Sequence, residues 1–219
     1  ASPNGYPDKD YKALVERLRN GFPEAKYIDI SGLLSADDFY YTDSHWRQER
    51  ITKVADEIAA QMGAERIGTC EIQDTGRPFY GVYYGQAALP HAPERLFYLD
   101  NAVIRGLKVY NVETQSDIPV YDLGAAAGRD PYEMFLGGAR SIIKITNPNA
   151  AQERRLIVFR DSFGSSIAPL LAAGYSEITL VDIRYISPLS LGKLIDFTKA
   201  DDVLFLYSAS VINNSETIK

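Results

Sequence analysis

The feature that most constrains the fold is the alternation of short β-rich runs with helical stretches in the last third of the chain. Buried-strand patterns occupy 155–159, 178–181 and 203–207, and between them 165–173 and 189–198 have apolar residues at helical spacing. Gly174 follows the first of these helical stretches and Pro188 precedes the second, as expected at helix boundaries. Strands joined through helices form parallel sheets, so the pattern predicts an α/β fold with a mainly parallel sheet.

The remainder of the chain divides into a helical N-terminal part and a β-rich middle. Helices are predicted at 9–19 and 46–62, with Gly63 as a stop, and a strand is predicted at 26–30. From about 67 to 145 aromatic and β-branched residues cluster, Gly and Pro interrupt the pattern, and a helix is indicated only at 130–136. We interpret 67–145 as an irregular β-rich insertion within a single domain spanning 1–219.

Composition excludes several classes of protein. A chain of 219 residues with 46% hydrophobic and 24% charged residues can bury a full core without disulfides or a structural metal. The formal charge of −6 and the isoelectric point near 5.0 argue against a nucleic-acid partner. A lone cysteine, Cys70, excludes an internal disulfide.

The chain contains no run of about 18 apolar residues that would indicate a membrane span. It begins with Ala1 rather than with Met and a charged, then apolar, leader. We expect any export signal or membrane anchor to lie upstream of these residues.

Two short segments, 42–46 and 160–164, together supply an acid, a base and a nucleophile. A serine hydroxyl is a poor nucleophile unless an imidazole removes its proton, and a carboxylate that fixes the imidazole tautomer makes that base effective. Asp43, His45 and Ser162 are the residues of these types in the two segments, and the chain has only two histidines. Triads are defined by geometry, so the long separation in sequence is no objection.

The position of Ser162 also fits a nucleophile. A strand before it and a helix after it would expose the hydroxyl at a strand's carboxyl end, with backbone N–H groups placed to stabilise an oxyanion. Structural alternatives remain for both segments: Asp161 or Ser162 caps the following helix, and His45 is a polar residue at a helix start with Asp43 as its cap.

Several segments in a consistent order carry a family resemblance. They are 39–46, 132–138, 160–164, 181–185 and 201–207, which begin Phe39-Tyr40-Tyr41, Tyr132-Glu133-Met134, Arg160-Asp161-Ser162, Val181-Asp182-Ile183 and Asp201-Asp202-Val203. With these segments the sequence resembles the DHHW protein family, relatives of the SGNH-hydrolase-like alginate O-acetylation proteins. The resemblance implies a flavodoxin-like, SGNH-hydrolase-like three-layer α/β/α fold and a catalytic triad at Asp43, His45 and Ser162.

The chain departs from the family pattern at two positions near the site. Ser44 stands where the family has the first of two adjacent histidines, and Ala139 stands where an asparagine, a candidate oxyanion donor, typically follows two glycines. We therefore expect either weaker oxyanion stabilisation or stabilisation from the backbone N–H groups of Ser162 and Gly138.

Further residues are weaker candidates. Arg184 and Tyr185 follow a predicted strand and line the site beside Ser162, or Arg184 forms a structural ion pair with Asp161 or Asp182. His91 lies in a proline-rich segment typical of a surface loop. A metal site built from Asp37, Asp38, Asp43 and His45 lacks the spacing of known metal motifs, so neither a metal nor another cofactor is expected.

Tyrosines are unusually numerous, at 15, and amphipathic rings of this kind can pack on sugar faces. Those beside the predicted base or in the aromatic segment 79–85 are the candidate glycan contacts: Tyr40, Tyr41, Tyr80, Tyr83 and Tyr84.

Together these features predict an SGNH-like serine acetylesterase or O-acetyltransferase that forms an acetyl-serine at Ser162. The resemblance implies a cell-surface polysaccharide or acetylated glycan as substrate, a membrane-bound acetyl donor as partner, and an extracytoplasmic location. An alternative is a catalytically inactive glycan-binding or scaffold protein of the cell envelope, and a further one is an intracellular esterase. The discriminating geometry is hydrogen-bond reach from His45 to both Ser162 and Asp43.

Overall fold

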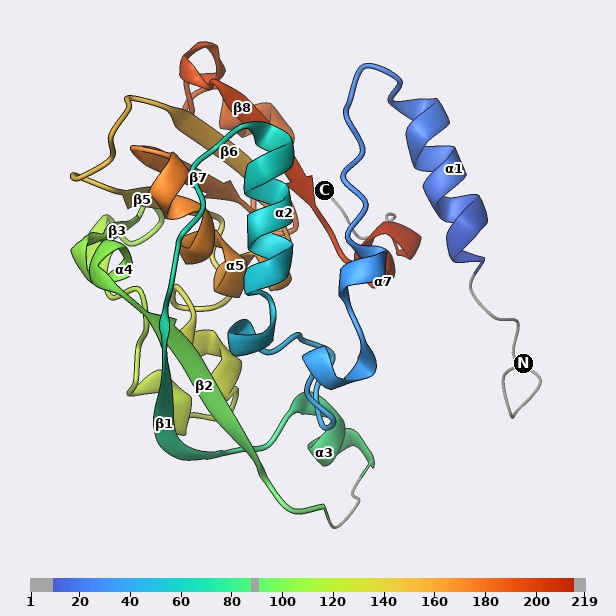
Figure 1. Ribbon diagram of the computed structural model, residues 1–219, viewed down its shortest axis with the longest axis vertical. Coiled ribbons are helices and arrows are strands. Elements are labelled where there is room, and N and C mark those ends of the chain that lie inside the picture. The colour runs from blue at the N-terminus through green and yellow to red at the C-terminus, as the bar shows by residue number, and fades with distance from the viewer. Residues whose placement is uncertain (1–9, 88–90, 215–219) are drawn as a thin grey trace.

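The computed structural model describes residues 10–87 and 91–214, so Lys9 at the start of the first predicted helix lies outside it. Its centre is a six-stranded sheet in the order β4-β3-β5-β7-β6-β8 (Figure 1). The strands are β3 (Lys108–Asn111), β4 (Ser116–Ile118), β5 (Ile142–Thr146), β6 (Arg155–Arg160), β7 (Glu177–Val181) and β8 (Asp202–Leu206). A separate two-stranded sheet pairs β1 (Glu71–Phe79) with β2 (Glu94–Asp100).

The predicted strands of the last third are confirmed as β6, β7 and β8, and β6 lies parallel to both of its neighbours. Between β6 and β7 runs α5 (Phe163–Leu171), which continues into a 3-10 turn at Ala172–Gly174. The long helix predicted at 189–198 is wrong. Only α6 (Pro188–Leu191) and a 3-10 turn at Phe197–Lys199 form there, because Gly192 follows α6 directly and the Asp196 side chain starts a new turn by accepting the Thr198 N–H.

The expectation of a mainly parallel sheet is wrong. β3 pairs antiparallel with β4 and with β5, and β5 pairs antiparallel with β7, so the six-stranded sheet is mixed. β3 and β4 are joined by a tight turn that contains Gln115 at φ +53°, and so short a connection permits only antiparallel pairing. Residues assigned to the insertion thus supply half of the main sheet.

The part of 67–145 that does leave the main sheet is the long β1–β2 hairpin, with α3 (Val82–Ala87) in its connection and α4 (Ala102–Gly106) after it. Figure 1 shows this hairpin extending away from the six strands, with α3 near its far end. The helix predicted at 130–136 is a 3-10 turn at Pro131–Met134, and Leu136 then takes φ +54°.

Helix predictions near the N-terminus are partly confirmed. Helix α1 (Tyr11–Gly21) forms but buries no residue, and it stands apart from the sheet in Figure 1. The strand predicted at 26–30 is wrong, since these residues pair with no strand in the described chain. Helix α2 (Thr52–Met62) ends at Gly63, which has φ +66°, but it begins six residues later than predicted.

The sheet has a core on each face. Helices α2 and α5 cover one face, where Ile143, Ile145, Leu156, Val158 and Leu180 are all buried. On the other face Ile142, Ile157 and Val181 pack against Leu191 and Ile195 from the α6 segment. In the part of the chain that the structure describes, no helix has the length and apolar character needed to span a membrane.

Candidate active site

The predicted acid and base lie in a tight loop, not at the entrance of α2 as expected. An isolated β-bridge between Phe39 and Trp46 closes the loop, and the Tyr40 N–H donates to the His45 carbonyl at 3.0 Å. Inside it, Asp43 Oδ1 accepts the backbone N–H of His45 at 2.9 Å, a local turn typical of aspartate. The backbone N–H and the ring of His45 therefore both meet Asp43 Oδ1, which brings the two side chains together.

The connection between β1 and β2 is hydrogen-bonded to this loop. The N–H of Val82 donates to Asp43 Oδ2 at 2.9 Å, and the N–H of Tyr83 donates to the Thr42 carbonyl at 3.0 Å. Gly81 makes the approach possible, because a Cβ on it would lie 2.1 Å from the Thr42 carbonyl oxygen.

Glu94, at the start of β2, holds the same loop from a second direction. Its two carboxylate oxygens accept the N–H of Tyr41 at 2.9 Å and both the N–H and the hydroxyl of Thr42 at 2.7 Å. Charge-assisted bonds of this kind are about twice as strong as neutral ones. No sequence signal indicated Glu94, since its partners lie about fifty residues away and share no motif with it.

Ser162 lies between the end of β6 and the start of α5, as predicted. The capping role belongs to Asp161: its Oδ1 accepts the Phe163 N–H at 3.0 Å and its Oδ2 accepts the Ser208 N–H at 2.8 Å. The Ser162 side chain makes no cap hydrogen bond to the helix. Its hydroxyl is thus available for another partner.

Gly164 allows α5 to begin directly over the last residue of β6. A Cβ at Gly164 would lie 2.6 Å from Cβ of Arg160, a side chain that is fully buried. The tight strand-to-helix turn that presents Ser162 therefore depends on this glycine.

The structure brings Asp43, His45 and Ser162 together. His45 Nδ1 lies 2.5 Å from Asp43 Oδ1, and His45 Nε2 lies 2.6 Å from Ser162 Oγ. Because a carboxylate only accepts, the contact with Asp43 requires the proton on Nδ1, and in a neutral imidazole Nε2 is then the acceptor that faces the serine hydroxyl. This is the arrangement in which an imidazole acts as general base towards a serine.

The electrostatics keep Asp43 charged. Burial by itself raises the pKa of this carboxyl, but the hydrogen bond and charge of His45 and the N–H groups of Val82 and His45 outweigh it, and the pKa is lowered. The Asp43 side chain is 2% exposed and that of His45 is 12% exposed. A buried carboxylate of this kind stabilises a positive charge on a neighbouring imidazole.

Arg184 is paired with Asp182 rather than turned to Ser162. Its Nε and Nη2 donate to the two oxygens of Asp182 at 2.9 and 2.7 Å, and these bonds raise the pKa of the guanidinium. The Tyr185 ring lies 5.4 Å from the Arg184 guanidinium carbon and is half exposed. Asp182 also faces the buried guanidinium of Arg160 at 3.7 Å, so the three charges form one cluster at the strand ends.

Gly138 lies in a strained turn next to this cluster. Leu136, Gly137 and Gly138 have φ of +54°, +70° and +73°, and the Gly138 N–H donates to the Phe135 carbonyl at 3.1 Å. That N–H is therefore engaged within its own turn. The backbone N–H of Ser162 has no acceptor among the described residues, which makes it a free donor next to the Ser162 hydroxyl.

The candidate glycan contacts divide by exposure. Tyr41 is 78% exposed and stacks on His91, with ring centroids 4.9 Å apart. Tyr80 and Tyr83 are also exposed, and the rings of Tyr80 and Tyr84 lie 4.7 Å apart. They lie in the segment next to the loop 39–46, which contains Asp43 and His45 and is called the acid loop below. Tyr40 is buried against Phe79 and presents no ring to solvent.

The acidic residues near the loop have protein partners. Asp38 accepts a hydrogen bond from Lys53 at 2.9 Å and from the N–H of Ser35 at 2.8 Å, and Asp43 bonds His45. Over residues 10–87 and 91–214, no group of three or more His, Cys, Asp or Glu side chains is arranged to hold a metal ion.

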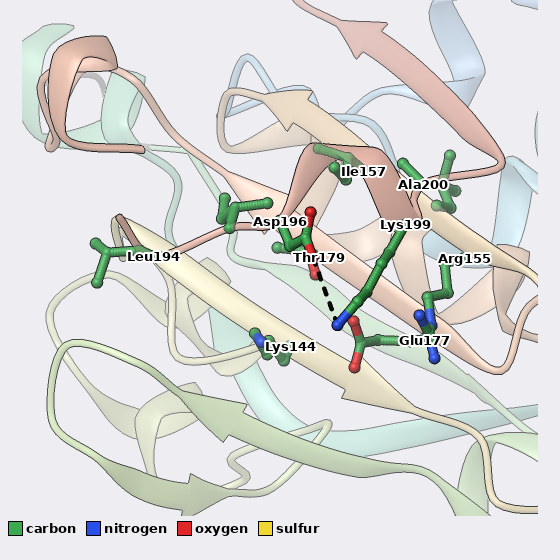
Figure 2. Close-up of a pocket in the computed structure, with 11 residues that line it drawn as sticks. Lys144, Arg155, Ile157, Glu177, Thr179, Leu194, Asp196, Lys199 and Ala200 are labelled. Carbon is green, nitrogen blue, oxygen red and sulfur yellow. Dashed lines mark ion pairs between the residues drawn. The ribbon is translucent and has the colours of Figure 1, made fainter. Parts of the chain in front are cut away.

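A surface pocket of about 290 Å³ lies at the opposite end of β6 from Ser162. Figure 2 shows its charged lining, with Lys199 paired to Asp196 and with Lys144, Arg155 and Glu177 nearby. None of Asp43, His45 and Ser162 lines it, so this pocket is separate from the candidate active site.

Fold and site together define an α/β domain with a serine, a histidine and an aspartate in hydrogen-bond contact beyond the carboxyl end of β6 in a mixed sheet. The model of the DHHW protein family matches residues 33–181, which include the acid loop and the serine turn. The chain belongs to this family.

Two solved structures, a DHHW family protein and PatB1, have a similar fold. A DHHW family protein from Eubacterium siraeum DSM 15702 superposes with a TM-score of 0.74 at 21% identity, over 100% of this chain and 77% of that one. PatB1 from Bacillus cereus, in a structure with a sulfonyl adduct, superposes with a TM-score of 0.64 at 21% identity, over 89% and 67%. AlgX from Pseudomonas aeruginosa gives a TM-score of 0.47 at 12% identity, over 90% and 44%. No curated protein matches the sequence.

Proposed function

We propose that this protein is an SGNH-like serine enzyme that transfers acetyl groups through an acetyl-serine, as an O-acetyltransferase or acetylesterase. The observation that carries the proposal is the position of His45, whose two ring nitrogens lie 2.5 Å from Asp43 Oδ1 and 2.6 Å from Ser162 Oγ. These contacts match the requirements for an activated serine: a base within reach of the hydroxyl and a carboxylate that orients the base.

In the first half-reaction, Ser162 Oγ attacks the carbonyl carbon of an acetyl ester while its proton moves to His45 Nε2. The tetrahedral intermediate collapses by breaking the bond between the acetyl carbon and the donor oxygen, and His45 returns the proton to that oxygen. Asp43 remains ionised throughout and stabilises the imidazolium. The products are the donor alcohol and an acetyl-serine at Ser162.

In the second half-reaction, His45 Nε2 takes a proton from an acceptor hydroxyl, whose oxygen attacks the acetyl-serine. Collapse of this intermediate breaks the bond to Ser162 Oγ, which recovers a proton from His45. Water as acceptor gives hydrolysis, and a sugar hydroxyl gives transfer. We propose that the Ser162 N–H at the start of α5 donates to the negatively charged oxygen of both tetrahedral intermediates. The dipole of the helix adds to this stabilisation.

The acceptor in this proposal is a cell-surface polysaccharide. Support comes from the family resemblance and from the exposed rings of Tyr41, Tyr80 and Tyr83 around the acid loop, with Tyr84 against Tyr80. Accordingly we propose an extracytoplasmic location and a membrane-bound acetyl donor as partner.

Intact-protein mass spectrometry with an aryl sulfonyl fluoride tests the nucleophile. Ser162 Oγ attacks the sulfur, the S–F bond breaks, fluoride leaves and His45 takes the hydroxyl proton, which leaves one sulfonyl group on the protein. We expect a single adduct that peptide mapping places on Ser162, and no adduct in Ser162→Ala or His45→Ala. His91→Ala, which removes the only other histidine, should be labelled at the natural rate.

The same protein is then given an activated acetyl ester with and without a polysaccharide-derived oligosaccharide. Acetyl-oligosaccharide as product indicates transfer, and free acetate alone indicates an esterase. A folded natural chain that acquires neither a sulfonyl nor an acetyl group would overturn the enzymatic proposal in favour of an inactive glycan-binding protein.

A further inference from the structure

The imidazole of His45 rests on a buried aromatic ring that the triad does not include. Tyr132, in the 3-10 turn Pro131–Met134, stacks on it with ring centroids 3.9 Å apart and planes 11° from parallel. Tyr132 is only 3% exposed, so the contact is shielded from solvent. Such face-to-face contact restrains the tilt of the imidazole, and an aromatic face attracts the cation that the imidazole becomes after it takes a proton.

The hydroxyl of Tyr132 is anchored to the helix that follows the nucleophile. It donates to Ser166 Oγ on α5 at 2.7 Å, and the indole N–H of Trp46 donates to the same oxygen at 2.8 Å. Ser166 is fully buried and its hydroxyl donates in turn to the Phe163 carbonyl at 3.3 Å. Trp46, Tyr132 and helix α5 thus meet at the buried hydroxyl of Ser166.

This network links the position of the base to the position of the nucleophile. Burial raises the pKa of Tyr132 far above neutrality, so its hydroxyl stays protonated and remains a donor to Ser166. A change in the Tyr132 χ1 angle, which would swing the ring away from His45, would also carry the hydroxyl off Ser166 Oγ and leave a buried donor unpaired. The ring is therefore fixed relative to α5, and the imidazole stacked on it is fixed relative to Ser162.

We propose that Tyr132, anchored by Ser166, is a positioning residue that holds the imidazole of His45 in the orientation bridging Asp43 and Ser162, and that its ring stabilises the imidazolium formed in each proton transfer. This inference rests on the function proposed above. A tyrosine with only a packing role would affect stability when replaced, but would leave the reaction rate of the folded protein unchanged.

Proton NMR of the histidine rings tests the positioning directly, because the chain has only two histidines. The ring current of Tyr132 should shift the His45 ring protons upfield in the natural chain and in Tyr132→Phe. In Tyr132→Leu these signals should move downfield, while those of His91, which stacks on Tyr41, stay in place. Unchanged His45 signals in Tyr132→Leu would overturn the inference.

The rate of Ser162 sulfonylation tests the consequence, measured as a limiting rate and a half-saturating reagent concentration. Tyr132→Leu should lower the limiting rate by about 10²-fold with little change in the half-saturating concentration, as expected for a misplaced base. Tyr132→Phe and Ser166→Ala should each lower it severalfold, and the double variant should be no slower than either single one, because both act through one anchor. The matched control is Tyr121→Leu, which removes a partly buried tyrosine that is bonded to the Leu99 carbonyl and packed on Phe135 as Tyr132 is.

The outcomes separate this inference from the proposed function. Labelling of the natural chain at Ser162, with Tyr132→Leu as fast as Tyr121→Leu, overturns the role of Tyr132 and leaves the nucleophile standing. Absence of labelling in the natural chain overturns both. If Tyr132→Leu does not fold, the comparison rests on Tyr132→Phe and Ser166→Ala, and natural rates in both of these folded variants would also overturn the inference.

Discussion

The carboxylate of Asp43 is shared between two parts of the chain: Oδ1 faces the imidazole of His45, and Oδ2 accepts the backbone N–H of Val82 at 2.9 Å. Val82 begins α3, in the connection of the β1–β2 hairpin. The hairpin that extends from the main sheet is thus part of the candidate active site, because it sets the orientation of the acid (Figure 1).

Replacing Asp43 by Asn should remove most of the activity without unfolding the chain. The amide keeps the shape of the side chain but favours the wrong imidazole tautomer, and such a change in a triad costs on the order of 10³–10⁴-fold in rate. Sulfonylation kinetics of Ser162 provide the measurement. Asp38→Asn is the matched control, since Asp38 is as buried as Asp43 but bonds Lys53 and Ser35; an equal loss of rate in both variants would contradict the assigned role.

Glu94→Gln should loosen the acid loop. Each carboxylate oxygen accepts one backbone N–H of the loop, and the substitution replaces one of these oxygens by an NH₂ group that cannot accept it. A buried donor left unpaired costs about 1–3 kcal/mol. Both the free energy of unfolding and the sulfonylation rate should fall. Asp100→Asn, on the same strand but paired at the surface with Arg105, should change neither by a comparable amount; if it does, the effect belongs to the hairpin in general.

Gly81→Ala should be strongly destabilising, because the new Cβ would lie 2.1 Å from the Thr42 carbonyl oxygen and backbone must move. Strain of this kind costs about 1–3 kcal/mol or more. Thermal unfolding and labelling of Ser162 should both be affected. Gly85→Ala, four residues further on with no atom within 4 Å of the new Cβ, is the control and should unfold like the natural chain.

Gly164→Ala tests the strand-to-helix turn in the same way. Its Cβ would meet the buried side chain of Arg160 at 2.6 Å, which would push α5 and Ser162 away from His45. We expect loss of sulfonylation together with a lower melting temperature. Gly192→Ala, which has open space around the new Cβ, should retain both properties; natural labelling of a folded Gly164→Ala protein would show that the turn tolerates the shift.

Lowering the pH should reduce the stability of the folded protein as Asp38 and Asp43 become protonated. The pKa of each is lowered from 3.8 in the folded protein: burial raises it, but the bonds from Lys53 and Ser35 to Asp38, and from His45 and Val82 to Asp43, outweigh burial. A carboxyl with a lowered pKa contributes its full stability above 3.8 and loses it as the pH falls below that value through the folded pKa. Urea unfolding across this range should show the stability gap between the natural chain and Asp38→Asn shrinking as the pH decreases; a gap that widens would contradict the assignment.

The local sequence pattern was sufficient to predict the elements that are defined by apolar runs and by the residues at their ends. The strands β6, β7 and β8 and the helix α5 follow from apolar runs and from the residues that end them, and Gly63 ends α2 in the left-handed conformation that its position indicated. The types of residue in the triad were likewise visible in two short segments.

Other parts of the fold and site depended on contacts that no local pattern encodes. The direction of β3, β4 and β5 follows from a tight turn and from pairing with β7, and the late start of α2 follows from the bridge between Trp46 and Phe39. Glu94 lies far in sequence from the loop that it holds and belongs to no motif. Tyr132 lies in the family segment 132–138, but nothing in that segment indicated that its ring stacks on His45.

The sequence by itself therefore determined which segments form the parallel strands and which three residue types are available for chemistry, because burial pattern and side-chain chemistry are local properties. Only the tertiary structure decided that the sheet is mixed, that Asp161 rather than Ser162 caps α5, and that Glu94, Val82 and Tyr132 surround the triad. The physical reason is that strand direction and hydrogen-bond partners depend on which distant segments the folded chain brings within a few ångströms of one another.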